Sequence, residues 1–244
     1  MPLSVASGIS IGLGTAGVLG LAAGGFAFAS RWPGSQIFGS TLIAPARPSE
    51  LALTFDDGPN PAWTPHVLDV LARYGVKASF FLIGRFAEQK PGLTCSVAEA
   101  GHLIGAHSWS HPNLSLAAAH RVREELSRTK ETLEQITGKP VHFFRPPFGA
   151  RRPYVLRVAR ELGMVPVMWN AMTSDWRERS PDRISQRLMR KVDAQHRRGF
   201  AANIVLHDGG HLALNTDRGP SVAAAEKLLA RYAQTHKFVT VEAW

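Results

Sequence analysis

Two neighbouring carboxylates, Asp56 and Asp57, follow a short apolar run in the sequence LALTFDDGP at residues 51–59. Like charges this close repel each other, which favours protonation of one of the pair. Successive side chains of a strand point to opposite faces, so adjacent acids at its end can diverge into separate roles. The alternative is an Asx-rich turn without a chemical role. A catalytic site is the hypothesis that the rest of the sequence must support.

Two histidines four residues apart, His107 and His111 in HSWSH, could converge on one metal ion. Two imidazoles and a carboxylate form a common open site for a catalytic divalent metal. Asp57 is the nearest candidate for the carboxylate. The motif is not the HExxH of metalloproteases, since Ser108 stands in place of the glutamate, so a general base must lie elsewhere. Two surface histidines would show the same spacing.

Acid–base candidates occur in three further motifs. If Asp57 binds metal, Asp56 is free to act as a general base, and Arg145 in RPPFG could keep it ionised. His207 in LHD is a natural general acid for a leaving amine, and Asp175 in TSDW could raise its pKa by bonding the other ring nitrogen.

Three of these candidates could also have a purely structural role. His207 could form a local hydrogen bond with its neighbour Asp208 in place of acting as an acid. Trp176 and Leu206 would be apolar walls of the site, or ordinary packing residues.

These residues must be positioned by a regular framework. Short apolar runs with the character of strands cover Leu51–Phe55, Ala78–Ile83, His102–Ala106, Val141–Phe144, Met164–Trp169, Ala202–Leu206 and Phe238–Val241. Helical patterns lie between them at Thr64–Tyr74, Ser96–Ala100, Ser115–Thr137, Arg152–Leu162, Pro181–His196 and Ser221–Thr235. This alternation predicts an α/β protein with a mostly parallel sheet. The candidate residues follow five of the seven runs, as expected for a site at the carboxyl ends of strands.

The first thirty residues carry no charged side chain, and their apolar, Gly/Ala-rich stretch is long enough to span a bilayer. Residues 1–30 are therefore predicted to be a transmembrane signal-anchor or an uncleaved leader, and the small residues at Ala27-Phe28-Ala29 leave a cleaved signal peptide as the alternative. Residues 31–50 contain three prolines and are predicted to be a linker, which leaves 51–244 as the catalytic domain. Arg31 and Arg47 follow the apolar stretch, a charge pattern that favours a cytoplasmic domain.

Composition narrows the class of protein. Of 244 residues, 45% are hydrophobic and 19% charged, which is typical of a globular chain with one sizeable core. The net charge of +9 could attract nucleic acid, anionic lipid or an anionic cell-wall polymer. No RNP-like signature or dense basic block with interleaved aromatics is present, so nucleic-acid binding is not expected. Cys95 is the single cysteine, which excludes an intrachain disulfide.

The motifs TFDDGP, HSWSH, RPPFG, DW and LHD, in that order, resemble the polysaccharide deacetylases of carbohydrate esterase family four, the NodB-homology domain. The resemblance covers about Leu51–Trp244 and implies a distorted (β/α)7 barrel. It implies a divalent metal, most often Zn²⁺ and sometimes Co²⁺ or Ni²⁺, held by Asp57, His107 and His111.

The same resemblance assigns the remaining roles. Asp56 matches the catalytic base and His207 the catalytic acid. Arg145 matches the arginine that orients the base, and Asp175 the aspartate that tunes the acid. Residues around the acetyl group are expected to be Leu206 and Trp176, which form a wall, and Phe148, which offers its backbone N–H to the oxyanion. Position 148 is often tyrosine in the family.

The expected activity is therefore hydrolysis of N-acetyl groups on GlcNAc-containing glycans, with release of acetate. This is a hydrolase reaction on a linear amide. Peptidoglycan, chitin-like and lipid-linked glycans are the expected substrates, and an O-acetyl xylan or a small cyclic amide is the alternative. A non-catalytic glycan-binding protein would lack a base, acid or ligand, and none is missing. The activity also implies a membrane-anchored, extracytoplasmic domain, or a secreted one if the leader is cleaved, which opposes the charge pattern.

Overall fold

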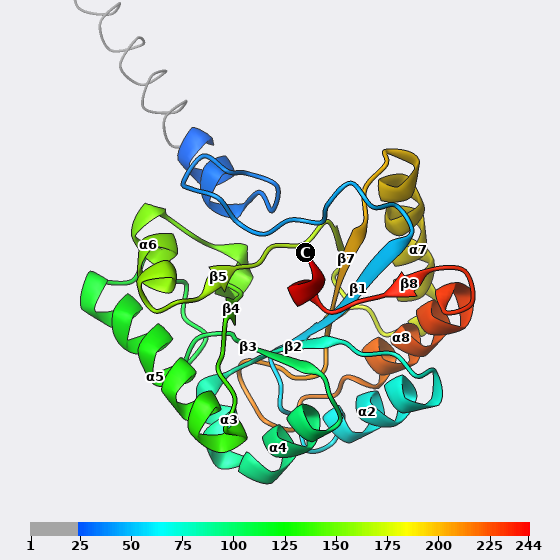
Figure 1. The fold of residues 1–244 in the computed structure, drawn as a ribbon, viewed down its shortest axis with the longest axis horizontal. Coiled ribbons are helices and arrows are strands. Elements are labelled where there is room, and N and C mark those ends of the chain that lie inside the picture. The colour runs from blue at the N-terminus through cyan, green and yellow to red at the C-terminus, as the bar shows by residue number, and fades with distance from the viewer. Residues whose placement is uncertain (1–23) are drawn as a thin grey trace, which may run out of the picture.

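A computed structural model describes residues 24–244. Within them, the strands form a single sheet in which every pairing is parallel, in the order β5-β4-β3-β2-β1-β7-β6, and β8 pairs with β1. The sheet curls, and the helices lie around its outer side (Figure 1). The strands are β1 Glu50–Asp56, β2 Ser79–Leu82, β3 Leu103–Ala106, β4 Phe143–Phe144, β5 Val165–Pro166, β6 Ala171–Met172, β7 Ala202–His207 and β8 Lys237–Phe238.

The helices follow the predicted alternation closely. They are α2 Thr64–Arg73, α3 Gly84–Gln89, α4 Pro91–Glu99, α5 Ala119–Thr137, α6 Pro153–Glu161, α7 Pro181–Arg197 and α8 Gly219–Tyr232. Each predicted strand run overlaps an observed strand, whereas β6 and α3 were not predicted because both are short. The helix predicted at Ser96–Ala100 begins earlier, at Pro91, which occupies a first helical position that suits proline.

The curled sheet is a half-barrel, because β5 and β6 are its two edges and do not pair with each other. A strap at residues 42–45 lies across this opening. The Leu42 N–H donates to the Pro166 carbonyl at 2.8 Å and the Met168 N–H donates to the Leu42 carbonyl at 3.0 Å. At the other side the Ala201 N–H donates to the Pro45 carbonyl at 2.8 Å. The predicted α/β parallel sheet is confirmed, and the barrel is open along one side.

Side-chain alternation gives β1 two different faces. Leu51, Leu53 and Phe55 belong to the large core between the sheet and the helices. Ala52 points to the concave side, where it joins a small apolar cluster with Phe81, Val167 and Val241. Asp56, on the same face of β1 as Ala52, reaches the pocket at the carboxyl end of the strand. The concave side is thus apolar at one end and polar at the other.

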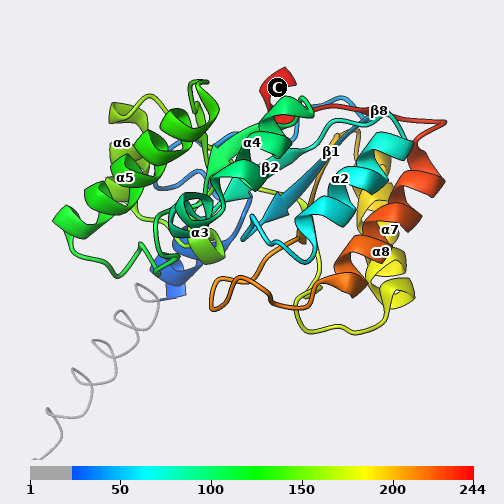
Figure 2. The same cartoon turned by 90° about the horizontal axis from the view of Figure 1, so that it is seen from below.

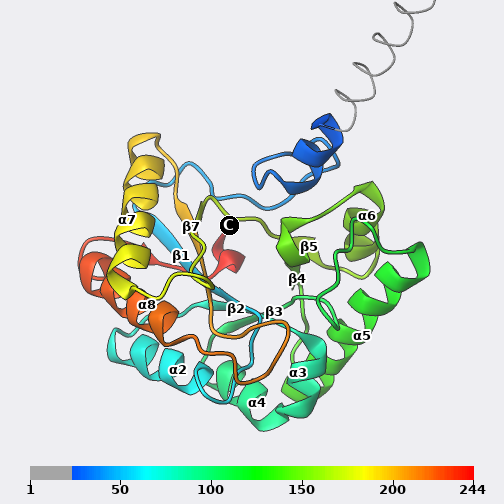
Figure 3. The ribbon, with the colours of Figure 1, turned by 180° about the vertical axis from the view of Figure 1, so that it is seen from behind.

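Figure 2 shows the barrel from the side, and Figure 3 shows it from behind relative to Figure 1. In Figure 2, residues 24–31, which are helical, lie at the same end of the molecule as the loop after β7, and the C-terminus lies at the opposite end. Among the described residues, no helix is both long and apolar enough to cross a membrane. Of the membrane segment predicted at residues 1–30, residues 1–23 lie outside the described residues.

Candidate active site

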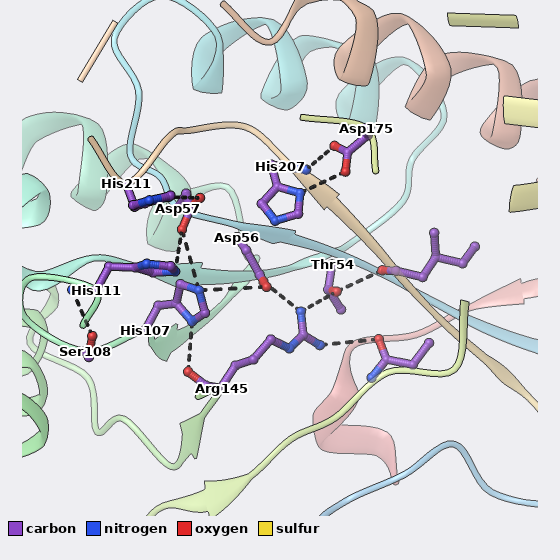
Figure 4. A network of polar contacts seen from close by, with 12 residues as sticks. Thr54, Asp56, Asp57, His107, Ser108, His111, Arg145, Asp175, His207 and His211 are labelled. Carbon is purple, nitrogen blue, oxygen red and sulfur yellow. Dashed lines mark hydrogen bonds and ion pairs between the residues drawn. The ribbon is translucent and has the colours of Figure 1, made fainter. Parts of the chain in front are cut away.

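Seven of the ten predicted site residues line a pocket of about 550 Å³ at the carboxyl ends of the strands. Figure 4 shows how the aspartates and histidines among them lie. The pocket lining includes both aspartates of the DDG motif, both histidines of HSWSH, Phe148, Trp176 and His207. Five motifs that are far apart in the chain therefore share one cavity, as the strand-end rule predicts.

The two acids do not diverge to opposite faces, which corrects the expectation from strand alternation. The strand ends at Asp56, and Asp57 has φ of +70°, which turns the chain into the left-handed region. Both carboxylates therefore border the same pocket: His107 Nε2 lies 4.0 Å from Asp56 Oδ2 and 3.6 Å from Asp57 Oδ1. Gly209 packs on this turn, where a Cβ would lie 2.0 Å from the Asp57 carbonyl oxygen, so only glycine fits.

Asp57, His107 and His111 form a buried cluster whose geometry suits a metal ion. Asp57 Oδ1 lies 3.2 Å from His111 Nε2 and 3.6 Å from His107 Nε2, and it is buried without a hydrogen-bond partner. The Nδ1 of His107 lies 2.8 Å from the Arg145 carbonyl, so Nδ1 carries the proton and Nε2 keeps a lone pair. An orphaned carboxylate oxygen facing two imidazole nitrogens is a donor set that a divalent cation satisfies.

Protonation states agree with that assignment. Burial lowers the pKa of His111 to about 3, so its imidazole is neutral at pH 7. Burial alone would raise the pKa of Asp57, but the surrounding histidines, His211 foremost, hold it below its ordinary value. Neutral imidazoles and an ionised carboxylate are the forms that bind metal.

The HSWSH motif is a tight loop rather than a helical turn. Ser108 and His111 both have positive φ, of 64° and 61°, and the His111 N–H donates to Ser108 Oγ at 3.1 Å. The buried carboxylate of Glu125 on α5 accepts from the Ser110 N–H at 2.8 Å and from its hydroxyl at 2.6 Å. Glu125 therefore fixes the loop that carries both histidines, and no sequence pattern pointed to it.

Strained backbone is concentrated at this site. The non-glycine residues with positive φ among residues 24–244 are Asp57, Ser108, His111 and Phe148. Each left-handed conformation costs about 1–2 kcal/mol for an L-residue. All four lie in the loops around the pocket, which is where strain in service of function is expected.

Arg145 and Asp56 form a buried ion pair. The guanidinium Nη1 donates to Asp56 Oδ1 and to Thr54 Oγ1, each at 2.7 Å, and the guanidinium lies 4.0 Å above the Phe81 ring. Burial lowers the pKa of Arg145 from its ordinary value, and Asp56 opposes that effect. The ion pair holds one oxygen of Asp56 and leaves the other, Oδ2, 4.0 Å from His107 Nε2.

His207 is paired with Asp175, as predicted, and not with Asp208. Its Nδ1 lies 2.9 Å from Asp175 Oδ1, and Asp175 Oδ2 accepts from the His207 N–H at 2.9 Å and from the Ser221 hydroxyl at 2.7 Å. Burial alone would lower the pKa of His207, but the charge and hydrogen bond of Asp175 raise it to about 9. Asp208 instead accepts from the Thr64 hydroxyl, and burial raises its pKa to about 7.

Two of the three residues expected around the acetyl group border the pocket. Phe148 packs edge-on against His111, with ring centroids 4.6 Å apart, and Trp176 packs edge-on against His207 at 5.1 Å. Leu206 does not: it is fully buried in the core on the helix side of β7. Alternation along the strand places Val205, and not Leu206, on the same face as His207.

His211 is a site residue that the sequence analysis missed. Its ring stacks on that of His111 at 4.5 Å, and its Nδ1 lies 3.8 Å from Asp57 Oδ2. Arg85 on α3 donates to the His211 carbonyl oxygen at 2.5 Å, which fixes this part of the loop after β7. The signal was available in HDGGH, where the histidine follows the LHD motif by a short, glycine-rich turn.

Comparison with known proteins gives a consistent result. A family model described as polysaccharide deacetylase matches residues 44–167. A peptidoglycan-N-acetylglucosamine deacetylase of Bacillus cereus is 36% identical over 176 residues, which cover 71% of this chain and 62% of the relative. A chitooligosaccharide deacetylase of Azorhizobium caulinodans is 36% identical over 175 residues, which cover 71% of this chain and 80% of the relative.

Solved structures share the fold. The Bc1960 peptidoglycan N-acetylglucosamine deacetylase aligns with a TM-score of 0.73 at 32% identity, covering 83% of this chain and 92% of that one. A CE4 family pseudoenzyme from Bacillus anthracis aligns with a TM-score of 0.71 at 26% identity, covering 80% and 64%. Because the fold is shared with a protein described as a pseudoenzyme, the fold alone does not decide activity, and the side chains in the pocket must.

Proposed function

This chain belongs to the polysaccharide deacetylase family, and we propose that it removes N-acetyl groups from a GlcNAc-containing glycan and releases acetate. The observation that carries the proposal is one pocket that holds a base, an acid and a set of metal ligands. Asp56 is oriented by Arg145 at 2.7 Å, and His207 is oriented by Asp175 at 2.9 Å. The names of the relatives in Bacillus and Azorhizobium support a peptidoglycan or chitooligosaccharide substrate.

We assign the metal to Asp57, His107 and His111. Two imidazoles with one carboxylate favour Zn²⁺, and Co²⁺ or Ni²⁺ accept the same ligands. When bound, such a cation supplies Lewis-acid polarisation of the acetyl carbonyl and lowers the pKa of water. Asp57 would contribute Oδ1, because this oxygen is buried without a hydrogen-bond partner.

The residues then divide the proton transfers. Asp56 Oδ2 takes a proton from the water that attacks the acetyl carbon, while Arg145 holds Oδ1 and keeps the carboxylate oriented. His207 gives the proton on Nε2 to the amide nitrogen as the carbon–nitrogen bond breaks, while Asp175 holds Nδ1. Acetate and a glucosamine unit leave. Phe148, at the pocket rim with φ of 57°, is the proposed source of an N–H for the oxyanion.

The test is an acetate-release screen on the full chain with Zn²⁺. Substrates should include N-acetyl-chitooligosaccharides, N-acetylated peptidoglycan, an O-acetyl xylan and a cyclic amide. We expect release from the first two, loss of activity with a chelator, and recovery on adding metal. Release only from the xylan or the cyclic amide would favour the alternative hydrolase. Metal-loaded protein inactive on all four would exclude the enzyme.

We further propose that the catalytic domain is extracytoplasmic, anchored by residues 1–30 or secreted if they are cleaved. The proposed glycan substrates support this placement, although Arg31 and Arg47 favour the opposite orientation. Protease added to intact spheroplasts tests on which side of the membrane the domain lies. We expect the domain to be digested, and protection from the protease would place it in the cytoplasm.

A further inference from the structure

A buried arginine fastens the first described segment to the rim of the pocket. Arg151 is fully buried, and no ion pair is found for it within residues 24–244. Its two terminal nitrogens donate to four backbone carbonyls, those of Ser30 at 3.2 Å, Trp32 at 2.7 Å, Ser35 at 2.9 Å and Gly149 at 3.0 Å. Three of these carbonyls belong to residues 30–35, and the fourth directly follows Phe148. The segment and the pocket rim are therefore held as one unit.

The fastened segment exposes apolar side chains. We call Phe26, Phe28, Trp32 and Ile37 the N-terminal apolar patch; they are 47%, 51%, 58% and 69% exposed. Phe28 stacks on Trp32 with ring centroids 5.7 Å apart, so these two side chains form one continuous surface. Clustered exposed apolar residues of this kind mark an interaction site, unlike single exposed ones.

The sequence around the patch indicates what covers it. Residues 1–23, which lead directly into it, have no charged side chain, and no acidic residue occurs before Glu50. The charged residues in that stretch are Arg31 and Arg47. Aromatic side chains with arginine and without carboxylates suit the interface of an anionic bilayer. A protein surface that binds a glycan would instead need carboxylates or amides to bind hydroxyl groups. Gln36 is the single such side chain in residues 24–40.

The loop after β7, which lines the pocket through residues 210–212, lies at the same end of the molecule as the helical residues 24–31 (Figure 2). Three more exposed apolar side chains follow the carboxyl ends of β3, β4 and β7: Leu116, 77% exposed, Phe148, 52%, and Leu212, 85%. Phe148 and Leu212 line the pocket itself. A surface that contacts the patch would thus lie close to the pocket mouth.

We propose that the N-terminal apolar patch rests in the headgroup region of an anionic bilayer, and that Arg151 thereby holds the pocket mouth toward it. The substrate class that follows is an acetylated glycan carried at the membrane surface, such as a lipid-linked one. The substrate class rests on the proposed deacetylase activity, whereas the lipid contact does not.

The lipid contact is tested with the full chain in vesicles of phosphatidylglycerol and phosphatidylethanolamine. Cys95→Ser removes the single cysteine, and an environment-sensitive fluorophore is then attached through Ile37→Cys, Leu212→Cys or Lys237→Cys. Lys237 is the control, since its exposed side chain lies on β8 beside the amino end of β1. We expect nitroxide-labelled lipids to quench the label strongly at 37, less at 212 and not at 237. Quenching at 37 by aqueous iodide alone would overturn the proposal, as would shielding of 37 by soluble chitooligosaccharide in place of lipid.

The substrate class is tested with Phe28→Ser/Trp32→Ser. Phe200→Ser is the matched control, because Phe200 is also an exposed aromatic residue, 39% exposed, but precedes β7 at the opposite end. We expect the double variant to lose activity severalfold on a lipid-linked N-acetylated glycan in vesicles, with activity on soluble chitooligosaccharide unchanged. Equal loss on both substrates would refute the orienting role. Lipid quenching without any deacetylation would refute the proposed activity and leave the docking intact.

Discussion

Arg145 and Arg151 are close in sequence and equally buried, yet their surroundings differ completely. Arg145 faces the Asp56 carboxylate and lies over the Phe81 ring, within the pocket end of the barrel. Arg151 faces carbonyl oxygens, at the junction of residues 30–35 with the pocket rim. Burial lowers the pKa of both from the ordinary arginine value.

A buried arginine can thus either balance a buried acid or join backbone segments through hydrogen bonds. The charge of Arg145 is balanced by an acid that we propose takes part in the reaction, so removing either partner leaves an unpaired buried charge. Arg151 balances no acid among residues 24–244 and instead donates to four carbonyls, two of which, those of Ser35 and Gly149, accept from no backbone N–H there. Loss of Arg145 should therefore lower both activity and stability, whereas loss of Arg151 should mainly loosen the junction between residues 30–35 and the pocket rim.

Arg145→Ala should lower the stability of the fold more than any other substitution considered. It leaves Asp56 buried without its counter-charge, and breaking a buried pair typically costs about 3–5 kcal/mol of folding free energy. Urea unfolding measures that loss, and acetate release should fall in the protein that remains folded. Arg145→Lys is the control that retains charge but not the forked geometry. A stability loss below that of Arg151→Ala would contradict the distinction between the two arginines.

Asp56→Asn should have the next largest effect, a loss of rate without loss of the fold or of the metal. The amide oxygen can still accept from Arg145, but it no longer takes up a proton, and loss of a general base lowers rates about 10²–10⁴-fold. We expect kcat to fall in that range while metal content, measured by plasma emission, stays at the wild-type level. Loss of metal together with activity would place Asp56 among the ligands instead.

Arg151→Ala is expected to be milder. The carbonyls of Ser30 and Trp32 keep their backbone N–H partners, whereas those of Ser35 and Gly149 lose the donor that Arg151 supplies. Leaving buried groups unsatisfied costs about 1–3 kcal/mol each, less where water reaches them. The N-terminal segment should become more protease-sensitive near Ser30 while kcat on soluble oligosaccharide changes little. Limited proteolysis with mass spectrometry checks the first expectation. A collapse of kcat on the soluble substrate would show that Arg151 also supports the reaction.

The mildest change concerns the Asp175–His207 pair, which should set the pH dependence of activity. The catalytic acid must be protonated, and the folded pKa of His207 is raised to about 9, so activity should persist at neutral pH and decline as pH rises through that value. A bound cation would offset the charges of Asp56 and Asp57 and move this alkaline decline in activity to lower pH. Asp175→Asn keeps the hydrogen bond to His207 but removes the negative charge, so the decline should occur at a still lower pH. An unchanged profile of kcat/KM against pH would exclude His207 as the acid.

Sequence patterns predicted the framework well because each long strand and helix has its own periodicity. They also predicted which residues meet, since parallel strands bring their carboxyl ends together. Two details required the three-dimensional structure: the left-handed turn at Asp57 keeps both acids on one side, and Arg151, which has no charged partner among residues 24–244, belongs to no motif that would reveal it. His211 was missed although HDGGH contains it, because its glycine-rich loop has no period. Leu206 was predictable, because strand alternation itself places it opposite to His207.

The strap at residues 42–45 has a consequence for how the chain folds. Leu42 bonds to Pro166 and Met168, and Pro45 bonds to Ala201, so these contacts join the first quarter of the described chain to its second half. Contacts of such high sequence separation carry a large loop-closure entropy and slow folding. During synthesis the strap must wait for β5 and β7 to emerge, and until then the edges of the sheet stay open to other chains.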